Sequence, residues 1–149
     1  MSVLQRILHS PASLAPLMLR VPVGVILMGH GAQKLFGWFG GGGLAGTGQF
    51  MASLGLNPGE LMAFLAGSGE FFGGLFLLLG LLTRPAAVVV AFTMIVAIVS
   101  VHLPNGLFLA NGGYEFGLAL LAMAVSLAVS GAGCFGLDNL LAKSFKGKS

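Results

Sequence analysis

The chain has 149 residues, of which 56% are hydrophobic and only 7% are charged. A soluble domain carries about 25% charged residues, so this composition excludes an ordinary water-soluble globular protein. The formal net charge of +3 does not indicate a nucleic-acid-binding surface, because three of the seven basic residues lie in a short C-terminal tail. The sequence therefore predicts an all-α integral membrane protein whose partner is the lipid bilayer, with no nucleic-acid partner.

Four apolar segments approach the roughly 20 residues that a membrane-spanning helix needs. They cover residues 14–36, 60–82, 85–102 and 114–131. We expect them to form one four-helix transmembrane domain over residues 1–149, which ends in a basic tail at 138–149.

A glycine-rich connection at 37–59 separates the first two spans. Within it, residues 47–54 are expected to form a short surface or re-entrant helix. The second span opens with Asn57 as a helix N-cap and Pro58 at the first helical position, which is a common start signal.

The basic residues indicate how the chain is oriented in the membrane. With four spans, Arg6, Arg84 and the C-terminal lysines share one side, whereas the loop at 103–113 carries no Lys or Arg. The positive-inside rule places that basic side, with both termini, in the cytoplasm. Lys34 is the exception at the outer end, so we expect it to have a specific role.

The first span carries two charged residues on one face. At helical spacing, one stripe contains Arg20, Gly24, Leu27, Gly31 and Lys34. Ionised groups at membrane depth usually face the protein interior. The stripe is therefore expected to contact another helix and not lipid.

The second span offers a matching face, because Glu70 lies near its middle among small residues. Its neighbours one turn away are Ala66, Gly67, Gly73 and Gly74. Small residues let two helices approach closely in lipid. We therefore expect the first two spans to pack through their glycines, and Arg20 to reach Glu70.

A second polar group is expected at one outward-facing mouth of the bundle. It consists of Lys34, His102, Tyr114 and Glu115 at the outer level, with His30 and Gln33 below them. Structural roles remain open for several of these residues. Lys34 and Glu115 can form an interfacial ion pair, His102 can cap a helix end, and Arg20 with Glu70 can act as a lock that fixes helix register.

The sequence predicts no metal site, because no closely spaced pair such as HxxxH or ExxH occurs. Haem ligation by His30 and His102 stays an alternative that the spacing does not favour. The single cysteine, Cys134, excludes a CxxC redox pair within the chain.

Several short motifs follow one another in a specific order. They are Arg20…Gly24…His30-Gly31…Lys34-Leu35-Phe36-Gly37, Gly69-Glu70…Gly73-Gly74…Leu79-Gly80-Leu81-Leu82-Thr83-Arg84, Gly112-Gly113-Tyr114-Glu115 and Gly131-Ala132-Gly133…Gly136-Leu137-Asp138. From about Leu19 to Leu140 the chain thereby resembles the DoxX family of small bacterial membrane proteins. One departure is Cys134-Phe135-Gly136, where the family has an Arg-Phe-Ser-like stretch.

The resemblance implies a four-helix, multi-pass protein of the bacterial inner membrane. It also implies that the charged positions Arg20, Lys34, Glu70 and Glu115 are shared with the family. Relatives are associated with membrane redox chemistry, as a thiosulfate:quinone oxidoreductase subunit or in complexes with oxidative-stress proteins. A quinone is accordingly the cofactor that the resemblance suggests.

Three hypotheses about function stay open. In the first, the chain is a quinone-linked redox subunit: Lys34 or Arg20 stabilises charge on a quinone oxygen, Glu70 or His30 relays protons, and a partner subunit supplies electrons. In the second, it is a small-molecule or lipid-binding membrane protein, or a carrier that works as a homo-oligomer. In the third, it is a structural assembly subunit whose ion pairs hold the bundle together. Gln33, His102, Tyr114 and Glu115 complete the expected ligand-binding set in the first two cases.

Overall fold

The computed structural model describes residues 3–146, over which the chain is helical and contains no strand. The helices are α1 (Val3–Leu8), α2 (Leu14–Phe36), α3 (Gly43–Ser53), α4 (Gly59–Leu79), α5 (Thr83–Ala97), α6 (Glu115–Ser130) and α7 (Leu137–Lys146). A π-helical turn, η2 (Ile98–His102), continues α5. Three short 3-10 turns are η1 (Trp38–Gly40), η3 (Leu103–Asn105) and η4 (Leu109–Asn111).

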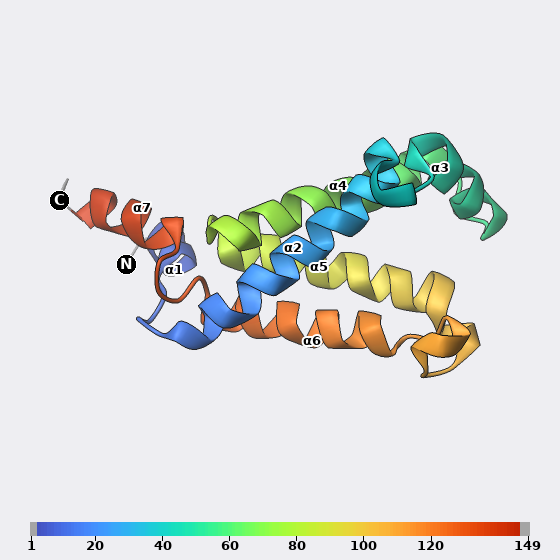
Figure 1. Cartoon of the computed structure of the whole chain (residues 1–149). Coiled ribbons are helices and arrows are strands. Elements are labelled where there is room, and N and C mark those ends of the chain that lie inside the picture. Colours follow the sequence, from blue (N-terminus) through green and yellow to red (C-terminus); the bar gives the residue numbers. More distant parts are fainter. Residues whose placement is uncertain (1–2, 147–149) are drawn as a thin grey trace.

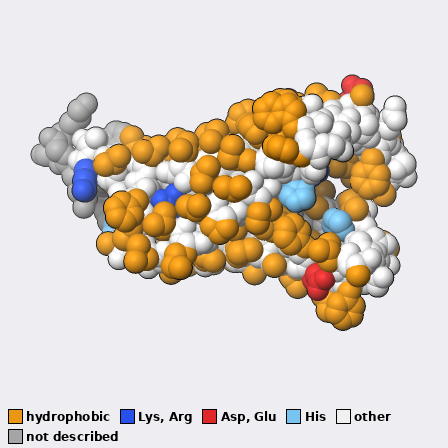
Figure 2. All heavy atoms as spheres, in the orientation of Figure 1, with side chains coloured by type: hydrophobic (Ala, Val, Ile, Leu, Met, Phe, Trp, Pro, Cys, Tyr) orange, Lys and Arg blue, Asp and Glu red, His pale blue; other side chains and the backbone are white. Residues whose placement is uncertain are grey.

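Within the described residues, three helical stretches are long and apolar enough to cross a membrane. They are Leu14–Phe36, Gly59–Leu79 and Thr83–Asn105, the last of which joins α5 to η2 and η3. The apolar helix α6 is shorter, with 16 residues. Hydrophobic side chains cover most of the face in Figure 2, as expected of a surface in contact with lipid.

Local backbone geometry sets the limits of α4. The helix ends before Gly80, whose φ of 63° is the left-handed conformation that often terminates helices, so it stops earlier than the predicted limit at residue 82. The predicted start signal is wrong in detail. Pro58 occupies the position before the first helical residue, Gly59, and no side chain caps this end.

Helices α2, α4, α5 and α6 run beside one another along the length of the molecule (Figure 1). Both termini, α1, α7 and the turn between α4 and α5 lie at one end, which we call the terminal end. Helix α3 and the loop at 103–113 lie at the opposite end, which we call the α3 end. This arrangement agrees with the predicted grouping of the termini and the Arg84 turn on one side.

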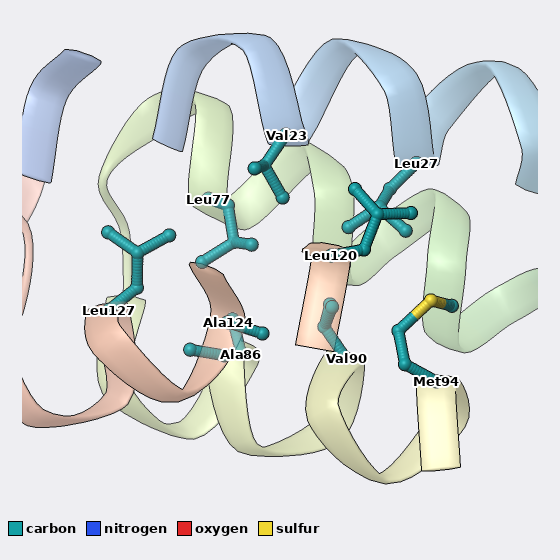
Figure 3. Packing of buried hydrophobic residues seen from close by; sticks show 10 residues of the cluster. Val23, Leu27, Leu77, Ala86, Val90, Met94, Leu120, Ala124 and Leu127 are labelled. Atoms are coloured by element: carbon teal, nitrogen blue, oxygen red, sulfur yellow. The ribbon is translucent and has the colours of Figure 1, made fainter. Parts of the chain in front are cut away.

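The apolar core joins these four helices and lies in the half of the bundle nearer the terminal end. Figure 3 shows Val23 of α2 beside Leu77 of α4 and Leu27 of α2 beside Leu120 of α6, with side chains of α5 below them. All of these residues are at most a few per cent exposed: Val23, Leu27, Leu77, Ala86, Ala87, Val90, Met94, Leu120, Ala124 and Leu127. Toward the α3 end, the polar residues of the predicted site replace this cluster.

The predicted glycine seam between α2 and α4 is confirmed. A Cβ atom on Gly24 would lie 2.7 Å from the carbonyl oxygen of Gly74. One on Gly31 would lie 2.7 Å from the carbonyl oxygen of Gly67. No side chain fits at such distances, so glycine is what allows the two backbones to touch. The contacts also fix the antiparallel register, with Gly24 opposite Gly74 and Gly31 opposite Gly67.

A polar network fastens the terminal end. Asp138, which is 1% exposed, accepts hydrogen bonds from the backbone N–H groups of Leu82 (2.6 Å) and Thr83 (2.9 Å). It therefore caps the start of α5 from a distant part of the chain. Arg84 donates to the carbonyl groups of Ala128 and Val129 at the end of α6. These bonds satisfy backbone groups that a helix end leaves without partners.

Candidate functional site

An ion pair between α2 and α4 is the central feature of the site. The Nζ atom of Lys34 lies 2.6 Å from Oε2 of Glu70, and these side chains are 25% and 5% exposed, respectively. Glu70 comes from the middle of α4 and Lys34 from the last turn of α2. The ion pair neutralises a carboxylate that would be very costly to bury alone.

The predicted pairing of Arg20 with Glu70 is wrong. Arg20 is 2% exposed, and its guanidinium donates to backbone carbonyl groups at the terminal end. The acceptors are Ala132 (3.0 Å), Leu77 (3.4 Å), Leu78 (2.6 Å) and Cys134 (3.2 Å). Arg20 thus connects the end of α4 to the segment before α7 through hydrogen bonds, which is a structural role.

Helix register explains this difference. Gly24 faces Gly74 in the antiparallel pair, so Arg20 lies level with the end of α4, where a Cβ on Gly80 would be 3.0 Å from its guanidinium carbon. Glu70 is ten residues earlier, which corresponds to about 15 Å along a helix. An arginine side chain does not span that distance. Lys34 lies beside Gly67, less than one turn from Glu70, where a Cβ on Gly67 would be 3.1 Å from the Lys34 Cβ.

Two open hollows flank the ion pair at the α3 end. The first, which we call the α3 hollow, measures about 340 Å³ and is lined by Gln33, Lys34, Gly41, Gly42, Gly46, Thr47 and Phe50. The second, the α6 hollow, measures about 370 Å³ and is lined by Val25, Ile26, Gly29, His30, Gln33, Phe39 and Phe116. Figure 2 shows the surface notched at this end of the molecule, with histidine side chains in the notch.

The α6 hollow combines apolar walls with two polar side chains. The imidazole of His30 lies against the ring of Phe116 of α6, with 6.0 Å between ring centroids. The amide of Gln33 donates to the carbonyl of Phe39 at 3.4 Å and borders both hollows. Such a hollow can hold a flat apolar ring between aromatic side chains and hydrogen-bond its oxygen atoms.

The remaining predicted site residues do not join Lys34. Glu115 accepts a hydrogen bond from the backbone N–H of Leu109 (2.6 Å), and Nδ1 of His102 lies 2.8 Å from the carbonyl oxygen of Gly112. The alternative in which Lys34 and Glu115 form an interfacial ion pair is therefore not what the structure shows, since Lys34 binds Glu70 and Glu115 binds the Leu109 N–H. Tyr114 is half-buried just before α6. The side chains of His102 and Glu115 thus bind the 103–113 loop, and the backbone N–H of Tyr114 donates to the carbonyl of Gly106.

Other residues of the site were missed from the sequence. Thr47 and Phe50 come from α3 and Phe116 from α6, and they complete the two hollows. A short, glycine-rich helix gives no sequence signal that it folds back over the end of α2. Asp138 lies in the first turn of α7 but caps the start of α5, and a local sequence pattern gives no signal for a cap supplied from so far along the chain.

No group of three or more His, Cys, Asp or Glu side chains suited to a metal occurs in the part of the chain that the structure describes. His30 lines the α6 hollow, whereas His102 is bonded to the loop.

Three helical stretches long and apolar enough to cross a membrane are typical of an integral membrane protein. The profile of the DoxX family matches residues 15–103, which contain α2 to α5, the glycine seam, Lys34 and Glu70. The chain belongs to the DoxX family, as the sequence motifs indicated. The resemblance noted at 112–138 extends beyond the segment that this profile matches.

Two relatives are similar over most of their length. The chain is 37% identical over 132 residues to "Putative oxidoreductase CatD" of Bacillus subtilis (strain 168), which covers 89% of this chain and 88% of that protein. It is 32% identical over 148 residues to "Uncharacterized membrane protein Rv3486" of Mycobacterium tuberculosis (strain ATCC 25618 / H37Rv), over 93% of this chain and 88% of that protein. No solved structure gives a significant match.

Proposed function

We propose that this protein is a quinone-linked redox subunit of the bacterial inner membrane, and that a quinone head group binds in the α6 hollow. The observation that carries the proposal is the composition of that hollow. His30 is exposed between the apolar residues of α2 and the ring of Phe116, with the Gln33 amide beside it. An exposed imidazole on a membrane helix is costly unless it faces a polar or functional partner.

The hollow fits a quinone head group in size and chemistry. Its volume of about 370 Å³ is at the lower end of the range for small-molecule pockets, about 300–1,000 Å³. Phe39 and Phe116 offer aromatic surface to the ring. His30 and Gln33 offer hydrogen bonds to two ring oxygens, and His30 can exchange a proton with one of them.

In this proposal the chain binds the quinone, and a partner subunit supplies electrons. Reduction of one quinone to a quinol takes up two electrons and two protons. The two electrons come from the redox group of the partner, which is oxidised by two electrons. His30 passes a proton to the ring oxygen to which it is bonded, and the other proton comes from water at the α3 end. The name of the Bacillus subtilis relative, which includes the word oxidoreductase, supports this class of reaction.

We propose four spans with both termini in the cytoplasm, so that α6 crosses the membrane with α2, α4 and α5. The basic side chains Arg6, Arg84 and Lys143 belong to the terminal end, and the positive-inside rule then orients that end toward the cytoplasm. Both hollows accordingly open near the outer surface. The α6 hollow is open and lies between α2 and Phe116 of α6, and in this proposal a lipid-soluble ligand enters it from the bilayer.

The test is binding of menaquinone-4 and ubiquinone-1 to the purified protein in nanodiscs, read as a shift of the melting temperature. We expect the wild type to be stabilised by at least one of them. His30→Leu and Phe116→Ala should weaken the apparent affinity by about tenfold each, since a lost hydrogen bond or aromatic contact is worth roughly 1–1.5 kcal/mol. His9→Leu changes an exposed histidine at the opposite end and should leave binding unchanged.

Two results would contradict the proposal. The first is that neither quinone shifts the melting temperature of the wild type. The second is that the shift persists in full in both His30→Leu and Phe116→Ala. Native mass spectrometry of protein extracted with its own lipids gives an independent measurement. A retained lipid in place of a quinone would favour the lipid-binding hypothesis.

A further inference from the structure

The α3 hollow has a charge environment unlike that of the α6 hollow. Among the Lys and Arg side chains that the structure describes, Lys34 alone lies at the α3 end. The others lie at the terminal end and are Arg6, Arg20, Arg84 and Lys143. The Lys34 side chain is 25% exposed and lines the hollow, whereas its partner Glu70 is 5% exposed and does not. One ammonium group is thus within reach of a buried carboxylate and of an open hollow.

The rest of the hollow suits a small anion with an apolar body. Thr47 supplies a hydroxyl group, Gln33 an amide and Phe50 a ring, and the other lining residues are glycines. No carboxylate lines it. With a single cation available, the charge of the hollow matches a monoanion and not a dianion.

Among the residues that the structure describes, only Lys34 balances the charge of Glu70. Helix α3, which packs on α4, has no ionisable side chain. On the other helices around Glu70, His30 faces the α6 hollow, while Arg20 and Arg84 bind carbonyl groups at the terminal end. At the far ends of α5 and α6, His102 and Glu115 bind backbone groups of the 103–113 loop, and Tyr114 lies directly before α6. If Lys34 turns toward a ligand, no other cation of the described residues replaces it beside Glu70.

We propose that the α3 hollow is a proton-coupled binding site for a small organic monoanion such as an aromatic carboxylate. The anion forms an ion pair with Lys34, and Lys34 releases Glu70. The carboxylate of Glu70, now buried without a counter-charge, takes up one proton from solvent and becomes neutral. Binding of one anion is thus accompanied by uptake of one proton, and no other bond forms or breaks. This site shares Gln33 with the α6 hollow, but neither Lys34 nor Glu70 lines that hollow, so the inference stands whether or not a quinone binds there.

The test uses sodium benzoate and the purified full-length protein in nanodiscs. Titration calorimetry at pH 7 in phosphate and in Tris separates the proton count from the binding heat, because the two buffers have different ionisation enthalpies. We expect the wild type to take up about one proton per benzoate, and its affinity to fall about tenfold per pH unit as pH rises. Benzamide, which is neutral and of the same shape, should not bind.

Variants of the ion pair make the test specific. Glu70→Gln frees Lys34, so it should bind benzoate at least tenfold more tightly, with no proton uptake and no pH dependence. Lys34→Arg keeps the charge and should keep proton-coupled binding, whereas Lys34→Met should lose it. Glu60→Gln removes an exposed carboxylate in the first turn of the same helix and should behave as the wild type.

Circular dichroism melting curves identify any variant that has failed to fold. Three results would overturn the inference. They are no binding of benzoate to the wild type, binding without proton uptake, and unchanged pH dependence in Glu70→Gln. None of these outcomes bears on quinone binding in the α6 hollow.

Discussion

Removal of Lys34 should destabilise the protein in a way that a change at Glu70 repairs. Lys34→Met leaves the Glu70 carboxylate, 5% exposed, without its partner at 2.6 Å. Breaking a buried ion pair from one side costs about 3–5 kcal/mol, whereas an exposed pair contributes about 0–1 kcal/mol. Because Lys34 is 25% exposed, we expect a loss of about 3 kcal/mol in the free energy of unfolding at pH 7.

The double variant Lys34→Met/Glu70→Leu places two apolar side chains in this position and should recover most of that loss. The assay is equilibrium unfolding in mixed dodecyl maltoside and dodecyl sulfate micelles, followed by circular dichroism. The same cycle with Arg20→Leu in place of Lys34→Met is the matched control, and it should show no recovery because Arg20 binds carbonyl groups. Recovery in the Arg20 cycle, or no recovery in the Lys34 cycle, would refute this assignment of the ion pair.

Two further predictions concern packing and capping. Gly31→Leu should lower the melting temperature strongly or prevent folding, since a Cβ there would lie 2.5 Å from the backbone nitrogen of Phe71, whereas Gly29→Leu meets nothing within 4 Å and should be tolerated. Asp138→Ala removes the acceptor of the Leu82 N–H at 2.6 Å and should cost about 1–3 kcal/mol in the unfolding assay, with Asp138→Asn intermediate. Equal stability of the two glycine variants, or an unchanged Asp138→Ala, would contradict these contacts.

The partner of Glu70 is a feature that local sequence patterns do not determine. The stripe on α2 places Arg20 and Lys34 on one face, and both are equally able to pair with an acid on α4. The choice between them depends on how far one antiparallel helix slides along the other. That displacement is set by the close contact of Gly31 with Gly67, which is a property of the packed pair.

The partners of Glu115 and His102 in the 103–113 loop were likewise not predictable from local patterns. Glu115 and His102 are polar residues near Lys34 in predicted depth, which suggested one common mouth. Each has a nearer partner in the loop backbone, at 2.6 Å and 2.8 Å respectively. Backbone groups at a helix end compete for side chains with any more distant ion.

The sequence by itself determined that this is an all-α membrane protein, where its four longest helices lie along the chain, and which small-residue faces of α2 and α4 meet. Those features depend on composition and helical periodicity, which are local. Only the tertiary structure decided that Glu70 binds Lys34, that Asp138 caps α5, and that α3 folds over the end of α2 to form a hollow. These contacts depend on the register between packed helices and on how distant segments of the chain fold against each other. Neither can be read from hydrophobicity or residue spacing.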